Sequence, residues 1–113
     1  MIKIYHNNHC QKSRLGVKLL EKMGCNFEIV NYLINPITKE TLKTLIKALD
    51  MQPIDLVRTN EALWKSKFKG KTLSDDEIIN TMLSHPKLIK RPIFTNGNKA
   101  VVGRPTERIQ EIV

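Results

Sequence analysis

"MIKIYHNNHCQKSRLGVKLLEKMGCNFEIVNYL", residues 1–33, contains the succession of local patterns that decides the fold. A short β-prone run at residues 2–5 is followed by apolar residues at helical spacing over residues 13–23, and Gly24 then supplies a helix-stop signal. Phe27 and Ile29 alternate with other residues, and Asn31 continues the alternation less cleanly, which predicts a second strand. Strand, helix and strand within about thirty residues is typical of a parallel βαβ unit.

The middle of the chain has the patterns of helices. In "TKETLKTLIKALD", residues 38–50, one helical face collects four apolar side chains, Leu42, Leu45, Ile46 and Leu49. "SDDEIINTMLSHP", residues 74–86, begins with Ser74 and Glu77 in the spacing of a capping box and ends at Pro86. Between these two segments, "PIDLVRTNEALWKSKF" predicts short helical turns and loop.

The end of the chain returns to strand patterns. "PIFTNGNKAVV", residues 92–102, has two β-prone runs around Asn96-Gly97, a hairpin signal, and "RPTERIQEIV" predicts a short final helix with Pro105 in its first turn. The complete order is therefore β-α-β, a helical block and β-β-α. We expect an α/β fold of thioredoxin-like plan, a mixed β-sheet with flanking helices. It forms a single domain over residues 1–113, with a helical lobe inserted at approximately residues 36–86.

Length and composition fit one soluble domain. The chain has 113 residues, of which 41% are hydrophobic and 27% charged. Its apolar runs are too short to span a bilayer, and its N-terminus lacks the pattern of a secretion signal. Two cysteines without such a signal fit a reducing compartment. We therefore expect a cytoplasmic protein with no membrane partner.

The net charge of +8 attracts anions of several kinds. In "KSKFKGK", residues 65–71, a lysine occupies every second position. No groove-reading motif and no interleaved aromatic set accompanies these charges. We interpret the stretch as a solvated surface and expect no nucleic-acid partner.

Cys10 lies at the predicted turn between the first strand and the first helix. The positive end of a helix favours a thiolate, which is the nucleophilic form of cysteine. Arg14 follows about one helical turn later and can lie on the same side as Cys10. His6 can stabilise the thiolate as an imidazolium or simply cap the strand. From the residues alone, a reactive thiol and a structural thiol both remain open.

Other chemistries for this segment fit the sequence less well. His6, His9 and Cys10 cluster, but a structural zinc site needs four ligands, so we expect no metal. The anion-binding loop of cysteine phosphatases places five residues between its cysteine and arginine, and Gly16 occupies that arginine position here. Ser13 stands where thioredoxins have their second cysteine, so Cys10 must pass any adduct to an external thiol.

Cys25 is poorly placed to act as an internal partner. It follows the predicted helix of residues 13–23, whereas Cys10 precedes it, and a helix of about 11 residues is ~16 Å long. A disulfide requires Cα atoms within about 7 Å. We expect Cys25 to be a small core residue.

Four motifs carry a resemblance to a known family. "YHNNHCQKSR" (residues 5–14), "LVRTNE" (56–61), "MLSHPKLIKRPI" (82–93) and "GRP" (103–105) occur in this order. Together they resemble the arsenate reductases that draw electrons from glutathione and glutaredoxin, and the related Spx-type regulators, over residues 2–110. Two positions depart from the family pattern. The family usually has proline where this chain has Asn8, and a histidine in front of the cysteine, here His9, is unusual.

The resemblance implies the site residues. Its catalytic set is Cys10, His6, Ser13 and Arg14, with Cys10 as nucleophile and His6 as promoter of the thiolate. Its substrate-binding set is Arg58, Arg91 and Arg104. Arginine forks bind tetrahedral oxyanions bidentately and keep their charge. Without the resemblance, each arginine has an equally simple structural interpretation, and His85 before Pro86 is interpreted as a helix end. The resemblance also implies a cis Arg91-Pro92 bond.

The function implied by this resemblance is an arsenate reductase-like oxidoreductase. Cys10 attacks arsenate, and glutathione with glutaredoxin supplies the electrons, so that arsenite is released. No bound cofactor or metal is expected. The alternative is an Spx-like regulator that binds RNA polymerase or an adaptor and has no arsenate activity. Three arginines combined with a single active cysteine favour the enzyme.

Overall fold

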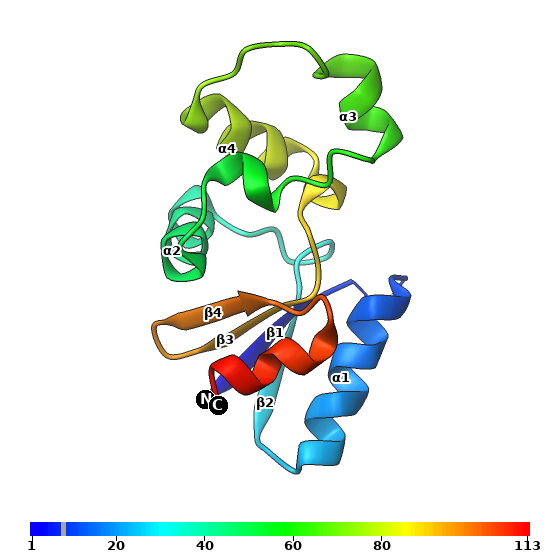
Figure 1. The fold of residues 1–113 in the computed structure, drawn as a ribbon, viewed down its shortest axis with the longest axis vertical. Helices are drawn as coiled ribbons and strands as arrows, with labels where there is room; N and C mark the ends of the chain where they lie inside the picture. The colour runs from blue at the N-terminus through cyan, green and yellow to red at the C-terminus, as the bar shows by residue number, and fades with distance from the viewer. Residues whose placement is uncertain (8) are drawn as a thin grey trace. The chain divides into compact units, whose positions relative to one another are not determined.

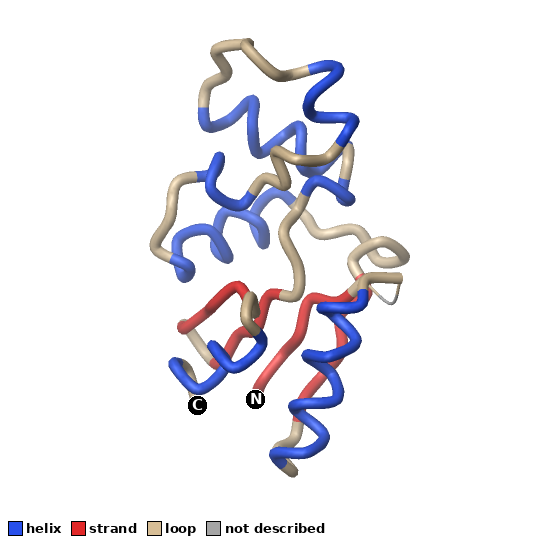
Figure 2. The backbone as a smooth tube through the Cα atoms, turned by 45° about the vertical axis from the view of Figure 1, so that its right-hand side comes forward, coloured by secondary structure: helices blue, strands red, loops and turns tan. Residues whose placement is uncertain are grey.

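The computed structural model describes residues 1–7 and 9–113, so Asn8, the family departure named above, lies outside the described residues. The backbone divides into two compact units. The first contains Met1–Asn35 and Arg91–Val113, and the second contains Pro36–Lys90. Figure 2 shows that the described strands belong to the first unit, whereas helices and loops make up the second.

The first unit is built around a four-stranded mixed sheet. Its strands are β1 (Ile2–His6), β2 (Phe27–Asn31), β3 (Ile93–Asn96) and β4 (Lys99–Val102), in the spatial order β2-β1-β3-β4. Strand β1 pairs parallel with β2, antiparallel β3 pairs on its other side, and β4 completes the hairpin. The predicted βαβ unit and the predicted hairpin are therefore confirmed.

Two helices cover one face of this sheet. Helix α1 (Gln11–Met23) and the 3₁₀ helix η3 (Thr106–Glu111) contact each other and lie in front of the strands in Figure 1. Between them and the sheet lies the apolar core of this unit, whose buried members are Ile2, Ile4, Leu20, Phe94, Val101, Ile109 and Ile112. Burial of such side chains contributes about 1.5–3 kcal/mol each.

Gly16 and Gly103 bring backbone close to this core. A Cβ on Gly16 would lie 3.0 Å from both Ile4 Cδ1 and Phe94 Cζ, and a Cβ on Gly103 would also meet the Phe94 ring. The Gly103 N–H donates to the Pro92 carbonyl at 2.8 Å. Glycine at these two positions therefore lets α1 and the segment after β4 approach Phe94 and Pro92.

Local signals explain where the elements of this unit end. Gly24 ends α1 in the left-handed conformation, with φ 69°, as predicted. Gly97 begins the two-residue turn of the hairpin with φ 63°, a conformation that glycine adopts without strain. The final helix is of 3₁₀ type, and Pro105 precedes it instead of lying in its first turn.

The second strand forms as predicted, but its alternating apolar side chains differ in exposure. The alternation of Phe27 and Ile29 predicted β2, but these side chains are not buried alike. Phe27 packs against the core, whereas Ile29 is 47% exposed. Strand β2 is an edge strand of the sheet, so it has a neighbour on one side only.

The second unit packs around α4 (Asp75–Ser84). This helix contacts α2 (Lys39–Leu49) and the 3₁₀ helices η1 (Pro53–Leu56) and η2 (Pro86–Leu88), and α3 (Ala62–Lys67) precedes it. Thr38 caps α2, and Ser74 with Glu77 forms the predicted capping box. The buried apolar residues of these helices include Leu42, Leu45, Ile46, Leu56, Ile78, Ile79, Met82 and Leu88. Among the described residues, no helix is long and apolar enough to cross a membrane.

Candidate active site

Cys10 occupies the N-cap of α1, at the end of the turn that follows β1. Its backbone is extended, with φ −100° and ψ 121°, and its N–H donates to the Asn7 carbonyl at 2.9 Å. Its own carbonyl accepts the Arg14 N–H at 3.0 Å, the first bond of the helix. The thiol is half-buried beside unpaired backbone N–H groups, an environment that favours the anion.

Two arginines from the distant end of the chain meet this thiol. The Arg91 guanidinium hydrogen-bonds the Cys10 sulfur, and Arg91 is only 9% exposed. The exposed Arg104 donates from Nε to the Arg91 carbonyl at 2.7 Å, and its Nη2 lies 3.9 Å from Cys10 Sγ. The structure therefore brings together three of the residues that the resemblance named, and both arginines adjoin cis proline bonds, Arg91-Pro92 as predicted and also Arg104-Pro105.

The surroundings of Cys10 change its acidity. Burial is the largest single influence and raises the pKa of the thiol, but the Arg91 hydrogen bond, the Ser13 backbone, the Arg91 charge and the Lys12 backbone together outweigh it. They bring the pKa of Cys10 down from its ordinary value of 9.0 to about 7. About half of the thiol is therefore ionised at neutral pH.

Ser13 acts on the backbone of the turn. Its side chain is fully buried in the first turn of α1, and its Oγ accepts the Asn7 N–H at 3.3 Å. Asn7 was not selected from the sequence, yet it contacts the turn through its N–H, its carbonyl and its Oδ1. The available signal was an asparagine just after a strand, because asparagine side chains commonly bond the backbone two residues on.

His6 lies in a buried environment next to the turn. It is 7% exposed at the end of β1, and among residues 1–7 and 9–113 its Nδ1 has no hydrogen-bond partner. Burial lowers the pKa of His6, the Ser13 backbone opposes this, and the charge of Arg14 adds to it. Burial therefore favours the neutral imidazole, and promotion of the thiolate by His6 stays a prediction from the resemblance.

Arg14 is exposed on α1. The sequence suggested that it shares a side with Cys10, and its N–H does bond the Cys10 carbonyl. The Arg91 and Arg104 guanidinium groups reach the thiol, and a direct role for Arg14 there stays a prediction from the resemblance. The charge of Arg14 acts on His6, whose pKa it helps to lower.

Arg58 belongs to the second unit, where its guanidinium is anchored on two sides. Its Nη1 lies 3.1 Å from Glu61 Oε2 and donates to the Lys87 carbonyl, also at 3.1 Å. Its backbone N–H donates to the Leu88 carbonyl at 2.7 Å. Oxyanion binding by Arg58 stays a prediction from the resemblance.

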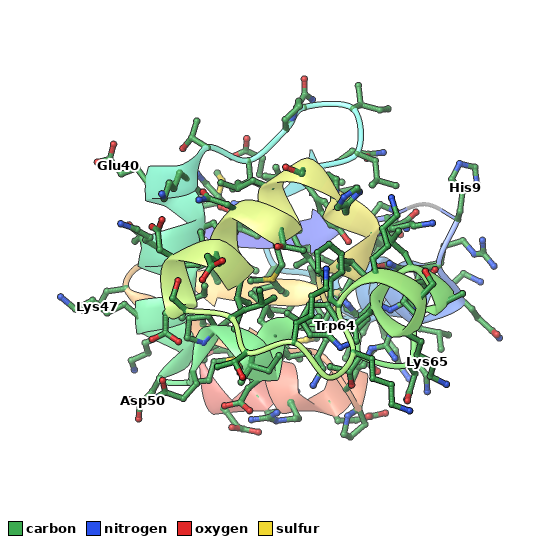
Figure 3. The ribbon with its side chains drawn as sticks, turned by 90° about the horizontal axis from the view of Figure 1, so that it is seen from above. His9, Glu40, Lys47, Asp50, Trp64 and Lys65 are labelled. Carbon is green, nitrogen blue, oxygen red and sulfur yellow. The ribbon has the colours of Figure 1, made fainter. Side chains whose placement is uncertain are left out.

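The histidines and the second cysteine lie in separate environments. His6 is buried, whereas His9 is exposed and points away from the ribbon in Figure 3. Within the described part of the chain, no three His, Cys, Asp or Glu side chains are grouped to hold a metal. Cys25 is a free thiol whose Sγ donates to the Leu20 carbonyl at 3.6 Å, and it packs against the core as expected.

An aromatic cluster ends α4 in the second unit. His85 is the C-cap of α4, as the sequence indicated, and its ring centroid lies 6.2 Å from that of Phe68. Phe68 in turn contacts Trp64 at 5.3 Å. Trp64 is buried and Lys65 beside it is exposed (Figure 3), so the aromatic residues here serve packing.

Comparisons with known proteins agree with one another. The sequence profile described as the ArsC family matches residues 5–112. The chain is 41% identical to the uncharacterized protein YfgD of Escherichia coli K12, over 99% of this chain and 96% of that protein. It is 38% identical to an arsenate reductase of Haemophilus influenzae, over 97% of each chain. The solved arsenate reductase of Vibrio cholerae superposes with a TM-score of 0.93 at 38% identity, over 99% of this chain and 97% of that one.

Proposed function

The chain belongs to the ArsC family, and on that premise we propose that it is a single-cysteine arsenate reductase supplied with electrons by glutathione and glutaredoxin. Arsenate reductase-like oxidoreductase activity follows from relatives that bear that name over nearly the whole chain. The observation that carries the finer proposal is the meeting of Cys10 with Arg91 and Arg104. It combines a nucleophile with two cations suited to a tetrahedral anion.

In the first step, the Cys10 thiolate attacks arsenic. Sulfur forms a bond to As(V), one oxygen leaves as water after taking up protons, and a cysteinyl arsenate remains. The two arginines neutralise the incoming anion, which would otherwise repel the thiolate. Because Arg104 is held by the Arg91 carbonyl at 2.7 Å, its fork is oriented before substrate arrives.

In the second step, the glutathione thiol attacks the Cys10 sulfur of this adduct. A sulfur–sulfur bond forms, and the electron pair of the sulfur–arsenic bond passes to arsenic. Arsenic is thereby reduced from As(V) to As(III), the glutathione proton goes to the departing arsenite, and the two thiols become a mixed disulfide. A glutaredoxin thiol then attacks the glutathione sulfur and releases Cys10 as thiolate.

The remaining residues of the set have supporting roles in this proposal. Arg58 is assigned to the oxyanion by the resemblance. Ser13 holds the turn that carries the nucleophile. His6 supports the site as a neutral side chain, since burial lowers its pKa. Arg14 contributes positive charge at the start of α1.

The test compares wild type with Cys10→Ser and Cys25→Ser. Arsenite production is measured with arsenate, glutathione and glutaredoxin present, and with each omitted in turn. We expect turnover that needs all three, is lost in Cys10→Ser and persists in Cys25→Ser. Mass spectrometry should find glutathione on Cys10.

Two results would contradict the proposal. One is a wild-type protein that produces no arsenite although its Cys10 is readily alkylated, which would favour the regulatory alternative. The other is a Cys10–Cys25 disulfide as the main oxidised product. That bond would require α1 to unfold, because the 13-residue helix separates the two cysteines by about 20 Å.

A further inference from the structure

Asn7 makes three backbone-directed hydrogen bonds around the turn that carries Cys10. Its N–H donates to Ser13 Oγ at 3.3 Å, and its Oδ1 accepts the His9 N–H at 2.9 Å. Its carbonyl accepts the Cys10 N–H at 2.9 Å. Asn7 is only 5% exposed and Ser13 is fully buried, so the bond between them is shielded from water, whereas the Oδ1 bond to the exposed His9 is only part-buried.

We propose that Asn7 is a positioning residue that fixes Cys10 at the N-cap of α1, so that its sulfur meets the helix N–H groups and the two arginines. For arsenate chemistry, this inference rests on the function proposed above. Asn7 touches neither substrate nor sulfur in this account. It acts through the backbone of Cys10.

The three bonds fix different parts of the same turn. The Ser13 bond ties the end of β1 to the first turn of α1, and the Oδ1 bond holds the His9 N–H. The carbonyl bond holds the Cys10 N–H itself. The thiol reaches the backbone of Lys12 and Ser13 only from this N-cap geometry, and those contacts help to lower the pKa of Cys10. Loss of the bonds that hold this turn should therefore raise the pKa of Cys10 and reduce the fraction of thiolate at neutral pH.

Asn31 provides an internal control because it uses the same turn chemistry without a cysteine. Its Oδ1 accepts the Leu33 N–H at 3.2 Å, and its carbonyl accepts the N–H groups of Ile34 at 3.1 Å and Asn35 at 2.9 Å. It ends β2 and pairs in register with His6 at the end of β1. Asn7 directly follows β1 and Asn31 is the last residue of β2, so both lie at the carboxyl ends of neighbouring parallel strands.

The experiment measures the alkylation rate of Cys10 by iodoacetamide against pH, in a Cys25→Ser background. Asn7→Ala removes the Oδ1 acceptor of the His9 N–H and keeps the two bonds made by the Asn7 backbone. It should raise the midpoint by about one unit and, once the higher reactivity of a more basic thiolate is included, slow alkylation at pH 7 about 2-fold. Asn7→Ser should recover part of the loss, since its hydroxyl can accept the same N–H. Asn31→Ala should leave the midpoint near 7 even if its melting temperature falls. With arsenate, kcat of Asn7→Ala should fall while KM changes less than about 2-fold.

An unchanged midpoint in folded Asn7→Ala, or an equal shift in Asn31→Ala, overturns the inference. If circular dichroism shows that Asn7→Ala is unfolded, Asn7→Gln decides, because its longer side chain keeps an amide but moves the oxygen away from the His9 N–H: a raised midpoint supports the inference and an unchanged one overturns it. The arsenate proposal fails separately. Wild type that alkylates with a midpoint near 7 but never reduces arsenate refutes that function and leaves the positioning role of Asn7 intact.

Discussion

Replacing Arg91 with methionine isolates the contribution of one guanidinium to the thiol. Methionine keeps an unbranched apolar stem at this buried position, and the Arg91 carbonyl that holds Arg104 belongs to the backbone and is retained. Arg91 supplies both a hydrogen bond and a charge that lower the pKa of Cys10, whereas burial raises it. Without the guanidinium, we expect the pKa of Cys10 to return from about 7 toward its ordinary 9.0.

The size of the effect on alkylation follows from two opposing factors. At pH 7, a rise from about 7 to about 9 reduces the thiolate fraction from about one half to about 1%, or about 50-fold. A more basic thiolate is intrinsically more reactive, and a Brønsted coefficient of about 0.4–0.5 recovers about 8-fold. The net expectation is alkylation about 6-fold slower at pH 7, with a midpoint shifted upward by up to about 2 units.

The assay is the rate of iodoacetamide labelling at Cys10 from pH 5 to pH 11, about two units below the wild-type midpoint near 7 and about two units above 9.0. Arg108→Met is the matched control, because Arg108 is exposed in the same unit and pairs with Glu111 at 2.9 Å. Its midpoint should equal that of wild type. If Arg91→Met also titrates with the wild-type midpoint, the argument that Arg91 activates the thiol is refuted.

Three further predictions concern His6, Gly16 and Glu61. Burial lowers the pKa of His6 below its ordinary 6.5, so the unfolded state binds a proton more tightly than the folded state does. The melting temperature should therefore be highest above pH 6.5 and fall as the pH drops below that value. In His6→Gln this fall should be smaller. Gly16→Ala places a Cβ 3.0 Å from Phe94 Cζ, so it should lower the free energy of unfolding in urea by about 1 kcal/mol despite alanine's helix propensity. Glu61→Gln removes the carboxylate 3.1 Å from Arg58, so KM for arsenate should fall up to about 5-fold if Arg58 binds the oxyanion.

Each of these has a clear contrary result. A His6→Gln variant as acid-sensitive as wild type would show that another group controls acid stability. A Gly16→Ala protein of equal or greater stability would mean that the core yields easily to the added methyl. A higher KM in Glu61→Gln would show that the carboxylate orients Arg58 rather than competing for it.

The sequence predicted the features that depend on local chemistry. Gly24 and the Ser74–Glu77 capping box mark helix ends through bonds within a few residues, and the structure has both. The order of strands and helices could also be predicted, because the spacing of apolar residues that distinguishes a strand from a helix is set within a few residues. The grouping of Arg91 and Arg104 with Cys10 came from motif resemblance, since no spacing along the chain brings residues so far apart together.

What the sequence did not predict depends on tertiary burial. From the residues alone, His6 could be an imidazolium or a strand cap, and its 7% exposure supplies the burial that lowers its pKa and favours the neutral form. Ile29 and Phe27 belong to the same alternating pattern, but that pattern does not show that β2 is an edge strand on which Ile29 is exposed. The sequence did not single out Asn7, because its N–H bonds a side chain on the next element, Ser13, and the full burial of Ser13 cannot be read from the sequence.

The pairing of β1, one of the two inner strands of the sheet, affects when Cys10 becomes reactive during synthesis of the chain. Strand β1 pairs on one side with the nearby β2 but on the other with β3, about 90 residues later in the chain. On the ribosome, synthesis proceeds from the N-terminus, so the nascent chain exposes Cys10 long before Arg91 and Arg104 are translated. During that interval the cysteine is an ordinary thiol of low nucleophilicity at neutral pH. We expect the pKa of Cys10 to reach its full lowering only after β3 has paired with β1, because Arg91 precedes β3 and belongs to the last part of the chain to be made.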